Sequence, residues 1–151
     1  MSINTFSAPS NSRFRYGNPS VECNGAELHK QCRQLATVLT ITGAIDDLNV
    51  ELVAQQAKGC IIAEKPFVLD LGGVTSFAAQ AITLLDVIDE ACHAAGDQWS
   101  LIASQSVSRT LRLCGVDEVF PTTASVPDAL HHFSDLAGER RRILPFFTKS
   151  A

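Results

Sequence analysis

The residues best placed to do chemistry lie between a short apolar run, F-V-L-D-L at positions 67–71, and an apolar pattern of helical period that begins near position 80. This pattern predicts a buried strand that feeds a helix through an exposed turn. In α/β proteins such turns often carry the active site, because backbone N–H groups and the positive end of the helix dipole meet there. This turn offers Ala78, Ala79 and Gln80, with no carboxylate, no nucleophile and no glycine-rich phosphate loop. We therefore expect it to act through its shape, with no catalytic step.

The five cysteines form no recognisable metal or redox motif, because no C-x-x-C occurs and no histidine stands at metal-finger spacing from a cysteine pair. Cys92 and Cys114 fall on apolar helical stripes and are predicted to be core thiols. Cys23 and Cys32 lie near the N-terminal edge and are expected to be exposed. A redox role for Cys114 remains the alternative, which requires an exposed thiolate and a resolving partner. We expect neither a metal nor a cofactor.

Composition limits the class of protein. The chain has 151 residues, of which 46% are hydrophobic, and this is enough for one sizeable core in a single domain. The net charge of −4 argues against general nucleic-acid binding, which needs a basic face. No apolar run approaches the ~20 residues of a membrane span, and the N-terminus lacks the apolar core of a signal peptide. A cytoplasmic protein without a membrane partner is expected.

Alternating strand and helix patterns predict an α/β fold: a mostly parallel mixed sheet of about five strands, an antiparallel N-terminal edge and about four helices. Asp46 or Asp47 is expected to cap the first helix, and Gly43 to end the strand before it. The expected strands cover residues 26–33, 36–42, 67–71, 99–103 and 119–121, and the expected helices cover 49–58, 80–95, 106–113 and a last segment that begins after Ser125. We interpret residues 1–25 as a flexible leader, 26–136 as the domain, and 137–151 as a tail that carries the basic run Arg140–Arg142.

Four segments in order resemble the STAS domain, the fold of bacterial anti-sigma factor antagonists. T-I-T-G-A-I-D at 40–46 resembles the family's strand-Gly-x-(Leu/Ile)-Asp signature, and F-V-L-D-L-G-G-V-T at 67–75 resembles its central strand. S-V-S-R-T-L-R-L-C-G-V-D-E-V-F-P at 106–121 is similar to its late helix-Gly run, and S-V-P-D-A-L at 125–130 to its closing helix. The match covers about residues 26–133, and it implies a single STAS-like domain.

The turn after the central strand departs from the family pattern. Phospho-regulated members read D-S-S-G-L there, and the second serine accepts a phosphoryl group from a kinase-like anti-sigma factor. The matching acceptor position in this chain is Gln80, and the neighbouring carboxylate position is Ala78. An amide cannot accept a phosphoryl group, so the usual switch cannot operate at this position. Ser76 and Thr75 are the nearest hydroxyls that could replace it, although such residues more often stabilise turns.

The resemblance implies a protein-interaction module that binds a kinase-like anti-sigma factor and acts as an anti-sigma factor antagonist. Asp46 matches the family's acidic position near the phospho-turn, and it is equally suited to capping the first helix. The alternatives are a nucleotide or small-molecule sensor, since the fold presents a helix-terminus anion site, and a structural STAS scaffold. The oligomeric state stays open. The expected partner-binding residues are Asp46, Ser76, Phe77, Ala78, Ala79, Gln80 and Ile82, together with the exposed face of the second helix.

Overall fold

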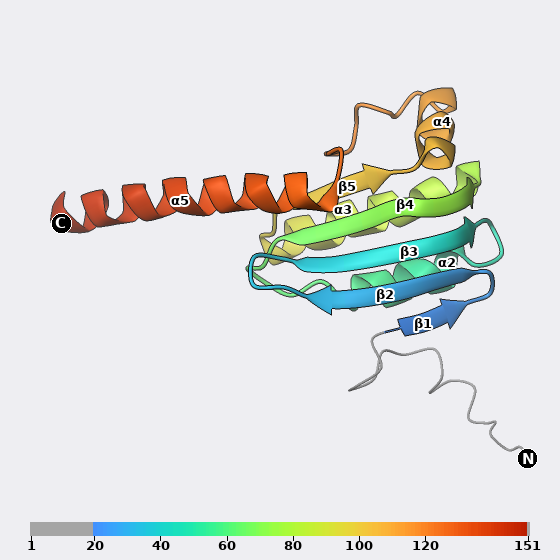
Figure 1. Ribbon diagram of the computed structural model, residues 1–151, viewed down its shortest axis with the longest axis horizontal. Coiled ribbons are helices and arrows are strands. Elements are labelled where there is room, and N and C mark those ends of the chain that lie inside the picture. The colour runs from blue at the N-terminus through green and yellow to red at the C-terminus, as the bar shows by residue number, and fades with distance from the viewer. Residues whose placement is uncertain (1–19, 151) are drawn as a thin grey trace, which may run out of the picture.

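The computed structural model describes the backbone of residues 20–150 and the side chains of residues 20–138. Figure 1 shows a single sheet with helices packed against it and a long C-terminal helix that extends beyond the ends of the strands. The elements in chain order are β1 (Ser20–Cys23), β2 (Ala26–Cys32), β3 (Thr37–Ile45), α2 (Val50–Lys58), β4 (Phe67–Phe77), the 3-10 turn η2 (Ala79–Ala81), α3 (Ile82–Ala95), β5 (Trp99–Ala103), α4 (Gln105–Leu113) and α5 (Val126–Ser150). Within the described residues, no helix combines the length and the apolar character needed to span a membrane.

The five strands lie in the sheet in their sequence order, from β1 at one edge to β5 at the other. β1, β2 and β3 pair antiparallel, whereas β3, β4 and β5 pair parallel. This arrangement confirms the predicted mixed sheet with an antiparallel N-terminal edge. It also brings the carboxyl ends of β3, β4 and β5 to the same side of the domain, where ligands and partners of α/β proteins commonly bind.

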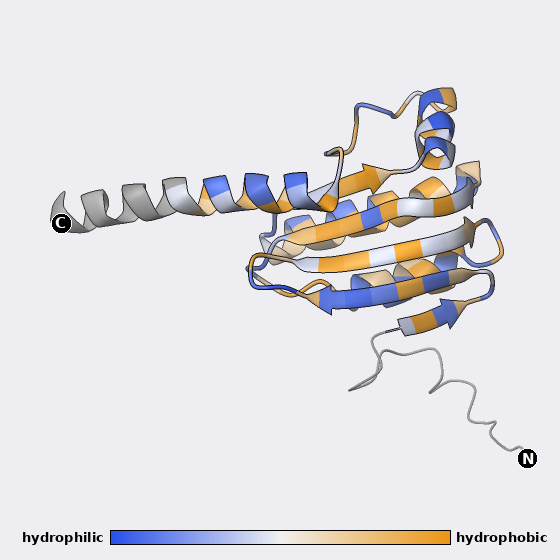
Figure 2. Ribbon diagram, viewed as in Figure 1, coloured by the Kyte–Doolittle hydropathy of each residue, from blue (hydrophilic) through white to orange (hydrophobic). Residues whose placement is uncertain are grey.

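Two hydrophobic clusters hold the helices to opposite faces of the sheet. The larger joins α2, α3 and α4 to one face, and the smaller joins the first turns of α5 to the other face. Figure 2 shows hydrophobic residues concentrated in β3, β4 and β5, while β2 is largely hydrophilic. The smaller cluster consists of Ala36, Val38, Val68, Ile102, Ala129 and Phe133. Helix α5 covers only part of the second face of the sheet, and the rest of that face is polar and exposed to solvent.

The N-terminal edge corrects one expectation for the leader. Residues 20–23 form β1, although the prediction included them in a flexible segment; residues 1–19 lie outside the described residues. Asn24 and Gly25 both have positive φ angles, 47° and 109°, and link β1 to β2 in a two-residue turn. Asn-Gly is a strong local signal for such a hairpin, and the sequence prediction overlooked it. Val21 and Cys23 therefore point into the core.

Two strands are longer than predicted, and glycine does not end either of them. β3 continues through Gly43 to Ile45, and β4 continues through Gly72 and Gly73 to Phe77. The pairing of β3 with β4 shifts twice, between Thr40 and Thr42 and between Gly43 and Ala44. At each shift β4 contains one more residue than β3, as in a β-bulge, so the strands stay paired through the glycines. The predicted exposed turn therefore begins only after Phe77.

The C-terminal third contains two further differences. Residues 119–121 were predicted as a strand, but they form a turn, and only Thr122 makes an isolated bridge to Leu101. Pro121 has no N–H to donate to a ladder, which limits pairing at this edge. Residues 137–150, predicted as a tail, continue α5 to Ser150. The segment A-G-E-R-R-R-I-L before Pro145 contains Ala, Glu, Arg and Leu, all of which favour helix.

Candidate functional site

The turn between β3 and α2 is held by a reciprocal cap. The Asp46 carboxylate oxygen Oδ1 accepts hydrogen bonds from the backbone N–H of Leu48, at 2.9 Å, and of Asn49, at 3.2 Å. The backbone N–H of Asp46 donates in return to Asn49 Oδ1 at 2.9 Å. This is the geometry of a capping box, in which two side chains satisfy the free donors at the start of a helix. The predicted cap at Asp46 is confirmed, while Asp47 is exposed.

Asn49 extends this cap into the interior of the domain. Its side chain is fully buried, and Nδ2 donates to the carbonyl oxygens of Cys23 and Asn24, each at 3.1 Å, and of Ala44, at 2.9 Å. One amide group therefore joins the β1–β2 hairpin, the end of β3 and the start of α2. The sequence analysis placed Asn49 only at the start of the first helix, because its partners Cys23 and Asn24 are too distant in the sequence for a local pattern to reveal.

The turn that follows β4 packs directly against this cap. The backbone N–H of Ala78 donates to the carbonyl of Ile45 at 3.0 Å, and Phe77 pairs with Ile45 in the sheet. Ala78 is extended, and η2 follows it before α3 begins. The Thr83 hydroxyl donates to the carbonyl of Gln80 at 2.9 Å and closes the turn. Asp46 and the segment 76–82 are thus neighbours, as the resemblance implied.

Exposure separates the expected partner-binding residues into two groups. Ser76, Ala79 and Gln80 are exposed, and Asp46 and Ala78 are half-buried. Phe77 is only 5% exposed and belongs to the core, so it supports the turn from below and cannot meet a partner. Ile82 is half-buried and packs against the same core. The accessible part of the predicted site therefore consists mainly of small side chains and carries little charge.

Helix α4 holds the turn from the side opposite to α2. The hydroxyls of Ser104, Ser106 and Thr110 donate to the backbone carbonyls of Val74, Thr75 and Phe77, in that order. The Thr75 hydroxyl in turn donates to the carbonyl of Gly43 at 3.2 Å. The sequence analysis missed these contacts. The sequence does place three hydroxyl residues at the start of an amphipathic helix. Their acceptors lie about 30 residues earlier in the chain, so no local pattern links the donors to them.

At the carboxyl ends of the parallel strands, the domain therefore presents a turn of small residues, and hydrogen bonds to its backbone fix it on both sides. A STAS domain family model matches residues 27–129 of this chain. The chain belongs to the STAS domain family. The region matched is close to the one that the four sequence motifs delimited.

This STAS domain is also similar to individual proteins and solved structures. "Osmosensory protein A" of Mycobacterium tuberculosis is 39% identical over 142 residues, which cover 91% of this chain and 90% of the relative. The crystal structure of an anti-sigma factor antagonist from Mycobacterium paratuberculosis superposes with a TM-score of 0.62 at 20% identity, covering 74% of this chain and 96% of that one. The antagonist SpoIIAA in its unphosphorylated form gives 0.58 at 11% identity, covering 72% and 96%. These two structures show the shared fold.

The cysteines of this STAS domain correct two predictions. Cys92 is buried and Cys32 is exposed, as expected, but Cys114 is exposed and Cys23 is buried. Cys114 is the residue that caps the C-terminus of α4, where the chain leaves the helix and the apolar stripe of Val107 and Leu111 ends. Cys23 lies on the core side of β1. Exposure is one requirement of a redox role for Cys114, which stays a prediction.

Native-state alkylation is expected to modify two of the five thiols quickly and the other three slowly. Burial raises the pKa of Cys92 to about 12 and that of Cys60 to about 11, and it also raises the pKa of Cys23. At pH 8 the reactive thiolate of Cys92 is then roughly a thousandfold rarer than for an ordinary thiol with a pKa near 9. Iodoacetamide labelling followed by peptide mass spectrometry should show Cys32 and Cys114 modified first. Rapid modification of Cys92 in the folded protein would contradict the burial.

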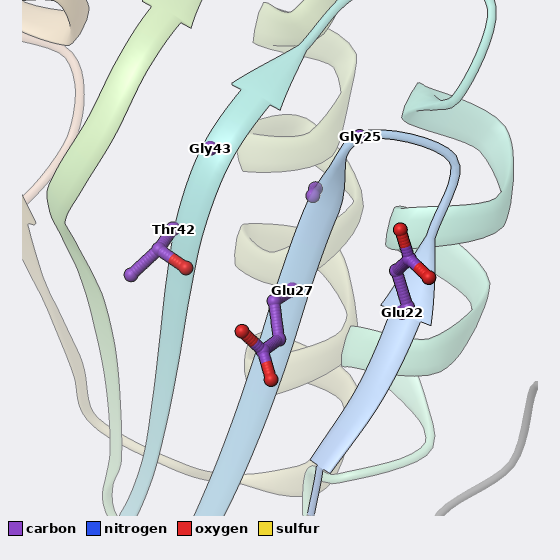
Figure 3. A pocket seen from close by; sticks show the side chains of 6 residues that line it. Glu22, Gly25, Glu27, Thr42 and Gly43 are labelled. Atoms are coloured by element: carbon purple, nitrogen blue, oxygen red, sulfur yellow. The ribbon is translucent and has the colours of Figure 1, made fainter.

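A separate hollow lies on the solvent-facing side of the sheet, beside the β1–β2 hairpin (Figure 3). It has a volume of about 440 Å³, and its lining includes Glu22, Glu27, Thr42 and Gly43. Glu22 and Glu27 are direct partners across β1 and β2, so two like charges face each other. Such a pair weakens strand pairing. The two glutamates therefore make this edge of the STAS domain negatively charged, and the residues that line the hollow do not include those of the turn at Ala78–Gln80.

Proposed function

We propose that this protein is an anti-sigma factor antagonist that acts by binding a kinase-like anti-sigma factor, and that the binding surface is formed by Asp46, Ser76, Ala78, Ala79 and Gln80. Bound to this surface, the anti-sigma factor releases its sigma factor by competition. The observation that carries the proposal is the exposed turn of small residues, held rigid between α2 and α4 at the carboxyl edge of the sheet. The antagonist structures that share this fold support it.

The same proposal assigns the chain a permanently unphosphorylated binding surface at position 80. A phosphate in phospho-regulated members adds roughly −1.5 to −2 charge next to a helix N-terminus, which a docked partner surface then has to accommodate. Gln80 is uncharged and cannot take up that group. Regulation must then come from another source, and the name of the 39% identical relative suggests osmotic stress as the input. We place the protein in the cytoplasm, where sigma factors act.

Two substitutions at the turn test the proposal. Gln80→Glu introduces the charge that a phosphate would bring, and Ala79→Leu introduces bulk where small side chains allow close approach. Each is expected to weaken binding to the kinase-like anti-sigma factor at least tenfold, measured by isothermal titration calorimetry with purified candidates from the same genome. Gln31→Glu, an exposed change on β2 far from the turn, is the matched control and should bind like the parent.

The fold should survive Gln80→Glu. No acidic residue occupies the first turn of α3, and a carboxylate near a helix N-terminus stabilises by about 0.3–1 kcal/mol. Thermal unfolding of each variant checks this directly. Folded variants that bind as tightly as the parent would show that the partner does not dock on this turn.

A further inference from the structure

Leu48 is the most exposed large hydrophobic side chain of the described residues, at 84%. It lies in the turn between β3 and α2, three residues after Ile45, whose carbonyl accepts the Ala78 N–H. Its own backbone N–H is bound by the Asp46 carboxylate. Leu48 is therefore exposed on a fixed backbone, and the strand that precedes it is hydrogen-bonded to the turn that carries Ala79 and Gln80.

The segments on the Leu48 side of the docking surface are mainly acidic, whereas α4, which holds the turn after β4 from its other side, carries Arg109 and Arg112. The two turns and the helices α2 and α3, which pack side by side, contain carboxylates but only one ammonium group, that of Lys58. Lys58 is in the last turn of α2, at the end of the helix away from Leu48. The carboxylates are Asp46, Asp47, Glu51, Asp86, Asp89 and Glu90.

An apolar centre with a charged rim is the common anatomy of a protein interface. We infer that Leu48 is the central apolar contact of the docking surface, and that the partner offers an apolar socket ringed by lysine and arginine. This inference rests on the proposed function and specifies the chemistry of the partner's side. It extends the binding surface from the turn after β4 to the cap of α2, a region that the sequence analysis assigned only to Asp46.

Leu48→Ala tests the apolar contact, and Leu113→Ala provides a matched control. Leu113 is 81% exposed at the end of α4, so the two truncations remove equal side chains of nearly equal exposure. We expect Leu48→Ala to weaken anti-sigma factor binding at least tenfold and Leu113→Ala to change it less than twofold. Both variants should unfold at the parent's temperature, because neither side chain is packed.

Charge reversal tests the rim. Asp47→Lys and Asp86→Lys are each expected to slow association and weaken binding several-fold at low salt, and the differences from the parent should shrink in about 0.5 M salt. Stronger binding by either variant would show that the partner's socket is not ringed by lysine and arginine. Gln31→Lys, on exposed β2, controls for a change of net charge alone.

The outcomes separate the inference from the function on which it rests. If Gln80→Glu abolishes binding and Leu48→Ala leaves it unchanged, the proposed function stands and the inference about Leu48 is wrong. If the parent protein binds none of the kinase-like anti-sigma factors, both are wrong. A selective loss in Leu48→Ala together with salt-dependent losses in the two lysine variants supports the inference.

Discussion

Gly43→Ala is expected to lower the free energy of unfolding by at least about 3 kcal/mol. Gly43 has a φ of +98°, and a Cβ atom built there would lie 2.3 Å from the carbonyl oxygen of Gly25. That oxygen accepts the Ala44 N–H at 3.0 Å, so it cannot move away without breaking the bond between the hairpin and β3. Backbone strain and steric overlap thus act at the same residue.

Urea denaturation followed by the fluorescence of Trp99, the single tryptophan, measures this effect. Trp99 is 7% exposed and donates to Asp89, so its emission reports loss of the core. Gly96→Ala is the matched control, because Gly96 also has a positive φ, +74°, but a Cβ atom at that position would meet nothing within 4 Å. Gly96→Ala should lower the free energy of unfolding only by the strain of a left-handed backbone, about 1–2 kcal/mol. Equal losses in the two variants would refute the steric part of the argument.

Gly43 also illustrates why the sequence predicted the fold better than its details. The four family motifs and the alternation of strand and helix patterns are local in sequence, and they led to the mixed sheet and to the STAS family. Gly43 was predicted to end its strand, and the strand before Gly72-Gly73 was predicted to stop at residue 71, because glycine is rare inside strands. Their actual role in a bulged parallel pair depends on residues about 30 positions away, which no local pattern reveals.

Local signals that were correct but overlooked account for other differences. Asn24-Gly25 is a short-range hairpin signal, and attention to it would have predicted β1 and a buried Cys23. The helix was predicted to end at residue 113, as α4 does, so Cys114 lies one residue beyond it, and extending the apolar stripe of Val107 and Leu111 to Cys114 was wrong. The two differences therefore have different causes: the first is a hairpin signal in the sequence itself, and the second is a helical pattern carried past the end of its helix.

The candidate site was predictable only in part, for a related physical reason. Asp46 and the turn at Ala78–Gln80 came from the resemblance, and the structure places them side by side. The burial of Phe77 could not be derived locally, because it results from the continuation of β4 and its pairing with Ile45. The residues that hold the site in place, Asn49 on one side and Thr110 on the other, act through backbone carbonyls of distant segments. Such contacts leave no spacing pattern in the sequence.

Asn49→Ala is expected to cost about 3 kcal/mol of folding free energy, because it removes a side-chain donor from three carbonyl oxygens, one of them in a buried bond and two in part-buried bonds. The three acceptors belong to Cys23, Asn24 and Ala44, and the variant also removes the acceptor for the Asp46 N–H. Asp46→Ala removes only the cap and should cost about 1 kcal/mol. Asp47→Asn, at an exposed neighbour, should change stability by less than about 0.5 kcal/mol. Urea denaturation of the three variants in parallel gives the comparison, and a loss in Asn49→Ala no larger than in Asp46→Ala would show that the buried amide is dispensable.

The same variant connects the stability of the cap to binding. Asn49 fixes the backbone that displays Leu48, so at temperatures where Asn49→Ala remains folded the Leu48 side chain should no longer be held in one position. Ordering that turn on binding costs conformational entropy, and anti-sigma factor affinity should fall, although Asn49 is buried and cannot touch a partner. The double variant Asn49→Ala, Leu48→Ala should then bind little worse than Leu48→Ala alone, because the buried amide acts on binding through the leucine that it positions.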